Sequence, residues 1–276
     1  MLLFHGLTGK QSKGKLRMVT LIEIFILAVV QGLTEWLPIS SSGHLVITQK
    51  ALGLNLPLIY SVMLHLGTLI VVLVVFRKDI FEIIKAVAKR DFQTEQGKLA
   101  LFIVVGSIPT AIVGFTLHDF LESLFSNLPA VGAALLITGA ILFISEKRTG
   151  NKKMNTTDSL LIGLAQAIAI IPGISRSGAT ISTALLRKID KTTAFKYSFL
   201  LSAPAIAGAT LMESKQLALN NIDPTPLLLG TIISMIVGYA SLKILQKIVM
   251  NEKLHLFSIY CWLAGATIIL LTILQT

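Results

Sequence analysis

Long apolar runs separated by short polar connections make up most of this 276-residue chain. Each run is close to the roughly 20 residues that a helix needs to cross a bilayer. The runs are apolar around the whole helix rather than along one stripe, which argues against a large soluble helical core. The pattern predicts an all-α polytopic membrane protein. Its spanning helices, about six in number, are expected over residues 59–76, 99–117, 129–145, 195–212, 226–242 and 255–274.

Two further segments, 21–50 and 158–186, are each interrupted by a proline, Pro38 in the first and Pro172 in the second. Proline disrupts a helix interior, so each segment is expected to form two short helices. Basic connections flank the second segment on both sides, and basic connections face the cytoplasm. That segment should therefore enter and leave the membrane on one side, as a re-entrant helix pair.

Composition supports the membrane assignment, because 14% of the residues are charged whereas a soluble domain has about 25%. The formal charge of +10 comes from Lys and Arg in alternate connections. A basic cytoplasmic face toward anionic lipid explains this charge, so no nucleic-acid partner is predicted. The single Cys261 excludes an intrachain disulfide and a cysteine metal cluster. Residues 1–17 are interpreted as a polar basic tail, and 18–276 as one membrane domain.

The two broken segments repeat each other along the chain. Gln31 corresponds to Gln166, and the serines and glycine that follow each proline correspond as well. Repeat one then covers residues 18–145 and repeat two covers 158–276. Each repeat has one re-entrant pair and three crossings, and an odd number of crossings gives the repeats opposite orientations. This predicts an inverted-topology repeat whose two re-entrant pairs meet near the bilayer midplane.

The two copies differ where charge is located. Glu35 and His44 belong to the first copy, and Arg176 belongs to the second. An arginine inside a membrane segment costs at least a few kcal/mol, and its planar donors suit phosphate. The asymmetry therefore predicts a composite site for an anionic, phosphate-bearing substrate. The alternative is that Arg176 pairs with Glu35 only to lock two helices together.

Hydroxyl groups and glycines surround this arginine. Glycine lets the backbone approach a ligand closely, and the helix that begins after the proline points its free N–H groups at an anion. The predicted phosphate-binding residues are Gln31, Gly173, Ser175, Arg176, Ser177, Gly178 and Thr180.

Gln31 and Glu35 lie four positions apart and so project from one face of a helix. Together with substrate phosphates they form a candidate site for a divalent cation, Mg²⁺ or Ca²⁺. Equally, Glu35 is placed to orient a nearby histidine. The sequence leaves both roles open.

His44 follows Ser41 by three residues in the turn after Pro38. A histidine titrates near pH 7 and suits proton transfer, and a serine beside it can be an activated nucleophile. His65 and His255 lie in or beside apolar runs without polar neighbours, and they are interpreted as structural. The predicted catalytic set is thus Glu35, Ser41, His44 and Arg176.

These motifs resemble the signatures of the bacterial undecaprenyl-diphosphatases, the bacitracin-resistance family. QGLTEWLPISSSGH, residues 31–44, is similar to the acidic first signature, and PGISRSGAT, residues 172–180, matches PGxSRSxxT at every fixed position. The resemblance covers the chain from Met18 onward. It implies hydrolysis of undecaprenyl diphosphate to undecaprenyl phosphate and inorganic phosphate. This step recycles the lipid carrier of peptidoglycan synthesis and gives bacitracin resistance.

By position, the resemblance implies that Glu35 is the essential acid, His44 the histidine, Ser41 the candidate nucleophile and Arg176 the phosphate clamp. It also implies dependence on a divalent cation and a polyprenyl diphosphate substrate drawn from membrane lipid. The expected location is the bacterial plasma membrane, with the site reached from its outer face. Attack by Ser41, by His44 or by water stays open, and so does a homodimer.

A transporter or flippase for an anionic or lipid-linked phosphate is the competing hypothesis, because inverted repeats with broken helices are common in carriers. A carrier would use Arg176 and the glycines. It would have less need of a serine–histidine pair beside a buried acid.

Overall fold

The computed structural model describes residues 19–54, 56–125, 127–146, 148, 150–219 and 224–275. The predicted tail, residues 1–17, lies outside them. The regular secondary structure of the described residues is helical apart from one isolated bridge between Lys152 and Ile189, which confirms the all-α class. The helices are α1 (Leu21–Trp36), α2 (Ser41–Ala51), α3 (Leu58–Val75), α4 (Arg77–Ala88), α5 (Glu95–Thr116), α6 (His118–Phe125), α7 (Leu128–Ser145), α8 (Thr156–Ile168), α9 (Arg176–Leu186), α10 (Lys191–Leu219), α11 (Pro224–Met250) and α12 (His255–Gln275).

The sequence repeat is also seen in the residues that cap the first helix of each pair. Thr20 caps α1 in a capping box with Glu23, and Asn155 caps α8 in a capping box with Asp158. Both helices stop before the next helix of their pair, which has 11 residues in α2 and 11 in α9. At 16 and 13 residues, α1 and α8 are too short to cross a bilayer alone. Each broken segment is therefore a short helix pair, as predicted.

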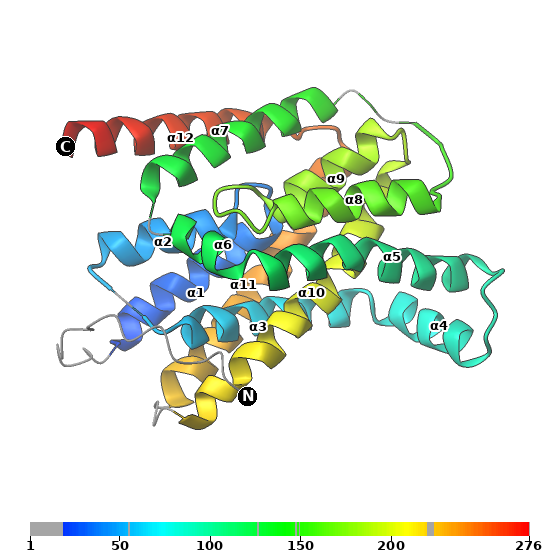
Figure 1. Cartoon of the computed structure of the whole chain (residues 1–276), viewed down its shortest axis with the longest axis horizontal. Coiled ribbons are helices and arrows are strands. Elements are labelled where there is room, and N and C mark those ends of the chain that lie inside the picture. The colour runs from blue at the N-terminus through cyan, green and yellow to red at the C-terminus, as the bar shows by residue number, and fades with distance from the viewer. Residues whose placement is uncertain are drawn as a thin grey trace.

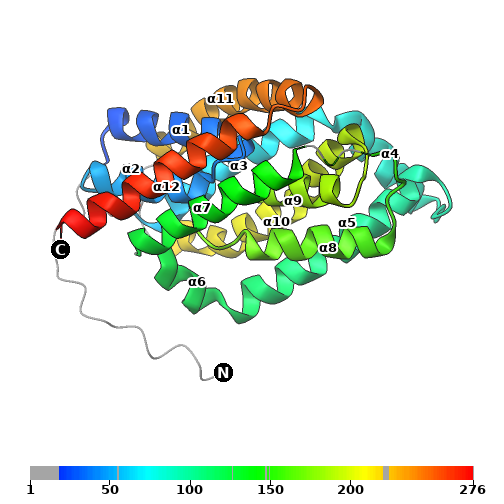
Figure 2. The ribbon, with the colours of Figure 1, turned by 90° about the horizontal axis from the view of Figure 1, so that it is seen from above.

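The two repeats exchange packing partners. Helix α1 lies along α11, and α8 lies along α5 (Figures 1 and 2). Glycines permit this closeness: a Cβ on Gly32 would be 2.9 Å from the Ser234 carbonyl oxygen, and one on Gly163 would be 2.2 Å from the Gly106 carbonyl oxygen. Each broken helix pair is thus held by a helix of the other repeat. The pairs α3–α10 and α7–α12 join equivalent helices.

Four described helices are long and apolar enough to cross a membrane on their own, namely α5, α7, α11 and α12. Helices α3 and α4 make a fifth span when counted together, although they are bent by 76° at their junction. The sixth predicted run, 195–212, lies in α10. This helix has 29 residues, but it carries Lys196 and several hydroxyl groups and is not among the helices apolar enough to cross a membrane on their own. These helices confirm a polytopic membrane protein.

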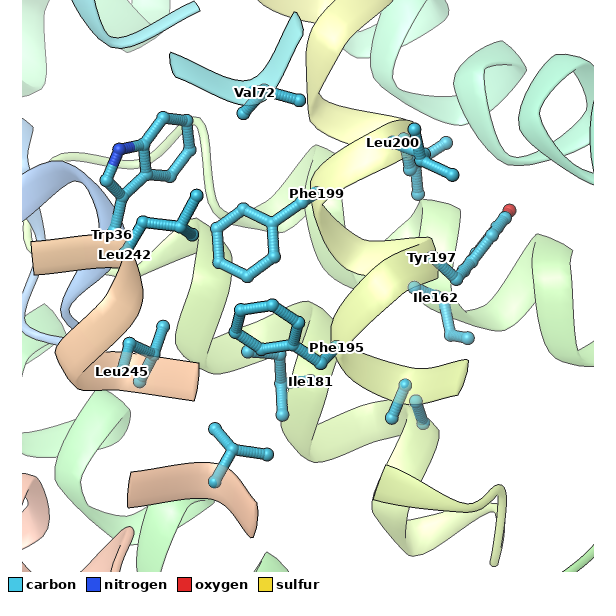
Figure 3. Close-up of a cluster of buried hydrophobic side chains, with 14 of the residues drawn as sticks. Trp36, Val72, Ile162, Ile181, Phe195, Tyr197, Phe199, Leu200, Leu242 and Leu245 are labelled. Atoms are coloured by element: carbon cyan, nitrogen blue, oxygen red, sulfur yellow. The ribbon is translucent and has the colours of Figure 1, made fainter. Parts of the chain in front are cut away.

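An aromatic core lies where α1, α10 and α11 meet (Figure 3). Trp36, the last residue of α1, packs edge-on against Phe199 of α10 with ring centroids 5.2 Å apart. The ring centroid of Phe195, one turn earlier on α10, lies 4.6 Å from that of Phe199. Burial of aromatic side chains contributes a large apolar area. It fixes the end of α1, and with it the neighbouring Glu35, against the second repeat.

Candidate active site

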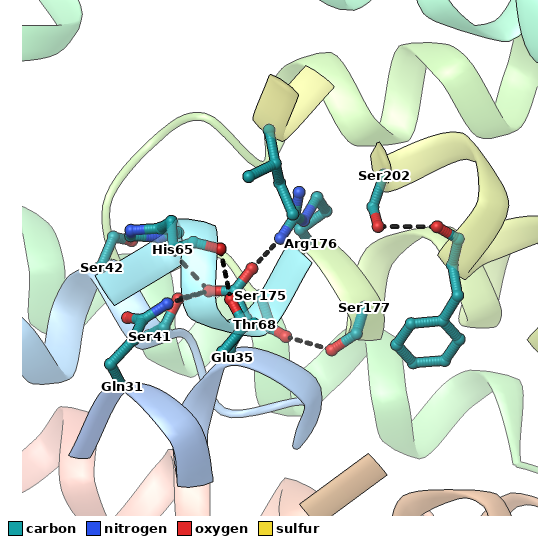
Figure 4. A network of polar contacts seen from close by, with 12 residues as sticks. Gln31, Glu35, Ser41, Ser42, His65, Thr68, Ser175, Arg176, Ser177 and Ser202 are labelled. Atoms are coloured by element: carbon teal, nitrogen blue, oxygen red, sulfur yellow. Dashed lines mark hydrogen bonds and ion pairs between the residues drawn. The ribbon is translucent and has the colours of Figure 1, made fainter. Parts of the chain in front are cut away.

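Glu35 lies in the last turn of α1 and is 5% exposed. Its Oε2 atom accepts hydrogen bonds from Gln31 Nε2 at 2.9 Å and from Ser41 Oγ at 2.6 Å (Figure 4). His65 Nε2 lies 3.3 Å from the same oxygen. The other oxygen, Oε1, pairs with Arg176. Side chains from helices α1, α2, α3 and α9 therefore converge on one buried carboxylate.

Arg176 is the first residue of α9, and its ion pair with Glu35 joins the two repeats. The pairing that the sequence offered as an alternative is thus present. A buried ion pair offsets its desolvation only when further hydrogen bonds complete it, and here Gln31 and Ser41 supply them. The Arg176 side chain keeps 20% exposure, and the pair occupies part of a five-donor guanidinium. The arginine can therefore exchange partners.

Matching serines cap the second helix of each pair. Ser40 accepts from the N–H of Gly43 at 3.3 Å, and Ser175 accepts from the N–H of Gly178 at 3.2 Å. Each capping hydroxyl also lies 3.2 Å from the hydroxyl two residues later, Ser42 in one copy and Ser177 in the other. The predicted repeat is therefore reproduced down to single hydrogen bonds.

The hydroxyl groups predicted to bind phosphate form hydrogen bonds that hold the turn at Arg176 in place. Ser175, Ser177 and Thr180 are buried. The N–H of Ser175 donates to Thr138 Oγ1 at 3.1 Å, and Thr180 is hydrogen-bonded to Ser198 of α10. Within the described contacts these side chains shape the turn, and Arg176 is the member of the motif that reaches Glu35.

The predicted glycines lie where the two repeats contact each other closely. Gly173 has φ +99°, and a Cβ there would lie 2.4 Å from the Val131 carbonyl oxygen. A Cβ on Gly178 would lie 3.2 Å from Pro38. The close backbone approach expected for a ligand is here an approach between repeats.

His44 is bound by Ser40 and Tyr260. Its Nδ1 lies 2.7 Å from the Ser40 carbonyl oxygen and its Nε2 lies 2.7 Å from the Tyr260 hydroxyl, while its ring stacks on Tyr260. Both ring nitrogens are therefore engaged by groups other than Ser41. The partner that the structure gives to Ser41 is the carboxylate of Glu35, in place of the predicted His44.

The expectation that His65 and His255 have no polar neighbours was wrong, because each has an acidic partner. His65 lies beside Glu35, and His255 Nδ1 is paired with Glu146 at the end of α7. The signal for His65 was a helical stripe, since Ser61, His65 and Thr68 are spaced by four and three residues on one face. Glu146 and His255 are 109 positions apart, so no helical spacing in the sequence indicates their contact.

A helical membrane protein built from two broken-helix repeats, with a buried acid from one repeat paired to an arginine from the other, is the class that the fold and the site define. The chain belongs to the family described as bacitracin resistance protein BacA, whose model matches residues 24–267. The resemblance found in the two motifs is thereby confirmed.

Curated relatives cover nearly the whole chain. A protein of Halothermothrix orenii named undecaprenyl-diphosphatase is 44% identical over 259 residues, which are 91% of this chain and 98% of the relative. Proteins of the same name from Carboxydothermus hydrogenoformans and Korarchaeum cryptofilum are 42% and 41% identical. Each match covers 90% of this chain, and 96% and 97% of those relatives respectively.

Proposed function

We propose that this protein hydrolyses undecaprenyl diphosphate to undecaprenyl phosphate and inorganic phosphate. The observation that carries the proposal is the position of Glu35 between Ser41 and Arg176, which come from different repeats. In this arrangement the proton acceptor is in direct contact with both a nucleophile and an anion-binding group. Membership of the family and the shared name of its relatives support the same activity.

The first step is an exchange of partners at Arg176. The guanidinium offers a planar fork of donors that fits phosphate oxygens. An incoming diphosphate competes with Glu35 for these donors, so binding of substrate frees one carboxylate oxygen. The acid then stays in place through its hydrogen bonds to Gln31 and Ser41 and its contact with His65.

The second step is attack on the terminal phosphorus. Ser41 Oγ forms the new bond to phosphorus, and its proton passes to Glu35 Oε2, 2.6 Å away. The bond from phosphorus to the bridging oxygen breaks, and undecaprenyl phosphate leaves with that electron pair. Water then hydrolyses the phosphoserine, which releases inorganic phosphate and restores Ser41. His44, one turn along α2, is the second candidate nucleophile, and the engagement of both its nitrogens favours Ser41.

We also propose that a divalent cation, Mg²⁺ or Ca²⁺, accompanies the diphosphate. Gln31 Oε1 is buried and has no hydrogen-bond partner within the described chain, and amide oxygen is a suitable ligand for a hard cation. Glu35 and Gln31 would hold the ion together with diphosphate oxygens, since the described residues contain no group of three or more His, Cys, Asp or Glu placed for a metal. When bound, the ion supplies neutralisation of charge on the diphosphate and on the leaving phosphate.

The proposed location is the bacterial plasma membrane, with the site open to the outer, periplasmic face. Basic connections flank α8 and α9 and favour the cytoplasm for the ends of that pair. The first pair, in the oppositely oriented repeat, would then enter from outside and bring Glu35 and Ser41 within reach of a substrate there. The prenyl tail would lie against the exposed apolar faces of the spanning helices.

Hydrolysis is favoured over transport by the Ser41–Glu35 contact, because a carrier does not need a hydroxyl donating to a buried acid. The test is release of phosphate from undecaprenyl diphosphate by the purified protein in detergent, compared with Ser41→Ala. Release that is lost in the variant supports the proposal. Binding of diphosphate by a folded wild-type protein without any release would instead favour the transporter.

A further inference from the structure

A buried hydroxyl on α7 holds the turn that leads into Arg176. Thr138 is 2% exposed, and its Oγ1 atom donates to the Gly173 carbonyl oxygen at 2.9 Å. The same atom accepts from the backbone N–H of Ser175 at 3.1 Å. One side chain therefore binds both ends of residues 173–175, immediately before the first residue of α9.

The turn is attached to repeat one on a second side as well. The N–H of Gly173 donates to the hydroxyl of Ser40, which caps α2. Both attachments come from repeat one, whereas Arg176 belongs to repeat two and reaches back to Glu35 of repeat one. The position of the guanidinium relative to Glu35 therefore depends on how this turn is attached.

The two repeats differ at the position of this hydroxyl. Residues 138–140 of α7 read Thr-Gly-Ala, and the corresponding residues 264–266 of α12 read Ala-Gly-Ala. Helix α12 contacts the first broken pair through Cys261, whose Sγ donates to the Pro38 carbonyl oxygen at 3.6 Å. A thiol is a weak donor compared with a hydroxyl. The stronger attachment is therefore on the turn that carries the arginine.

We propose that Thr138 is a positioning residue for Arg176, and this proposal rests on the proposed phosphatase function. Without the hydroxyl, the Gly173 carbonyl and the Ser175 N–H would both lose a partner in a buried place, which is unfavourable. The turn would shift to regain hydrogen bonds, and the start of α9 would shift with it. The role of Thr138 is greatest once the diphosphate has replaced Glu35 at the guanidinium, because the ion pair then no longer holds the arginine.

This role predicts a kinetic signature, because Thr138 acts on the reaction through Arg176. Misplacing a reacting group by about 1 Å costs on the order of a hundred-fold in rate. We expect kcat/KM of Thr138→Val to fall by roughly ten- to a hundred-fold, with KM raised as well as kcat lowered, since the arginine binds the diphosphate. In an Arg176→Ala background the same substitution should change kcat/KM by less than about two-fold, because groups that act as a unit are not additive.

The experiment compares Thr138→Val with Thr138→Ser in the full-length protein. Valine replaces the hydroxyl by a methyl group, whereas serine keeps the hydroxyl and should keep kcat and KM near their wild-type values. Thr138→Ala leaves the place of the hydroxyl empty and should match Thr138→Val, which excludes an effect of the added methyl group.

Ser145→Ala is the matched control. Ser145 also lies on α7 and makes a buried hydrogen bond to α9, with its hydroxyl 2.8 Å from that of Ser182. Its loss should lower the melting temperature and leave kcat and KM at their wild-type values. Equal kinetic losses in Ser145→Ala and Thr138→Val would assign the effect to weaker packing of α7 on α9 and would overturn the proposal. Wild-type kinetics in Thr138→Val would also overturn it, while leaving the phosphatase function intact.

A second measurement does not depend on turnover, so it separates failure of this proposal from failure of the phosphatase function. Melting temperatures in detergent of Thr138→Val, Arg176→Ala and the double variant form a double-mutant cycle. Thr138→Val should lower the melting temperature less when Arg176 is already absent, because part of its effect is a weaker ion pair with Glu35. The same cycle with Ser145→Ala should be additive. Additive losses in both cycles would contradict the proposal.

Discussion

The backbone N–H of Gly173 donates to the hydroxyl oxygen of Ser40 over 3.1 Å, across 133 positions of sequence. Ser40 is also the N-cap of α2 and has φ +69°, a conformation that non-glycine residues rarely adopt. One side chain therefore starts the helix that carries Ser41 and binds the turn that leads to Arg176. Backbone strain of this kind is maintained only where surrounding contacts fix the conformation, as they do here.

Gly173→Ala should destabilise the protein and lower its activity. An alanine at this position would have to adopt a positive φ, and its Cβ would lie 2.4 Å from the Val131 carbonyl oxygen. We expect a loss of at least about 1–3 kcal/mol, read as a lower melting temperature in detergent. Gly53→Ala is the matched control, because Gly53 has φ +62° with nothing within 4 Å of its Cβ position. Equal shifts in the two variants would show that the contact between repeats contributes nothing.

Ser41→Ala and Glu35→Gln should lower kcat by similar factors, on the order of a hundred- to ten-thousand-fold. Because the two groups act on the same proton, the double variant should be little worse than either single variant. Steady-state kinetics of phosphate release measure this. If the two losses instead multiply, Ser41 and Glu35 act independently, and transfer of the serine proton to the carboxylate is wrong.

Arg176→Lys should preserve charge but lose the planar fork of donors. We expect KM to rise and kcat to fall by about a hundred- to a thousand-fold, the scale for removing one donor from a developing charge. Arg187→Lys, the residue after α9 and a partner of Asp158, is the control and should keep nearly normal kinetics. Wild-type kinetics in Arg176→Lys would show that a point charge is sufficient.

Removal of divalent cations by a chelator should lower phosphate release by at least about ten-fold, and Mg²⁺ or Ca²⁺ should restore it. Gln31→Glu adds a charged oxygen ligand next to Glu35, so it should lower the cation concentration needed for half-maximal rate. A rate that is indifferent to chelator in both proteins would remove the cation from the proposed mechanism.

Asp158→Asn should destabilise the protein at neutral pH. Burial favours the neutral acid, but hydrogen bonds from Lys152, Arg187 and Asn155 outweigh it and lower the pKa of Asp158. A carboxylate with a depressed pKa stabilises the folded state above its unfolded pKa of about 3.9, and this contribution is lost as pH falls through the folded value. We expect a deficit of about 1–3 kcal/mol at pH 7 that shrinks below pH 4 or so. A deficit independent of pH would assign the loss to packing.

Much of the fold was predictable because it depends on local patterns. Apolar length predicts the spanning helices, and prolines predict the two breaks. Helices α4 and α6 were missed, since basic and acidic connections carried the topology argument and their own helical periodicity was not considered. The polar character of α10 was also missed. Its run of small and hydroxyl-bearing residues is apolar enough to suggest a span, yet Ser198 of this run is hydrogen-bonded to Thr180 of α9.

The composite site was predictable in its members and less so in its pairings. Gln31, Glu35, Ser41 and Arg176 converge as the repeat indicates, because matching helix caps place them in register. The partner of Ser41 depends on side-chain direction at the first turn of α2, which spacing alone does not determine. His65 was dismissed because its polar neighbours lie a helical turn away and its acidic partner lies on another helix.

The capping pattern shared by α2 and α9 has a consequence for how the site is assembled. Two copies of the first repeat would bring two carboxylates together, and two copies of the second would bring two guanidinium groups together. Neither half can therefore complete the acid–arginine pair by self-association, and the site needs both repeats. The two repeats share their helix caps, but within the described residues the acid comes from one repeat and the arginine from the other, so the site itself is asymmetric.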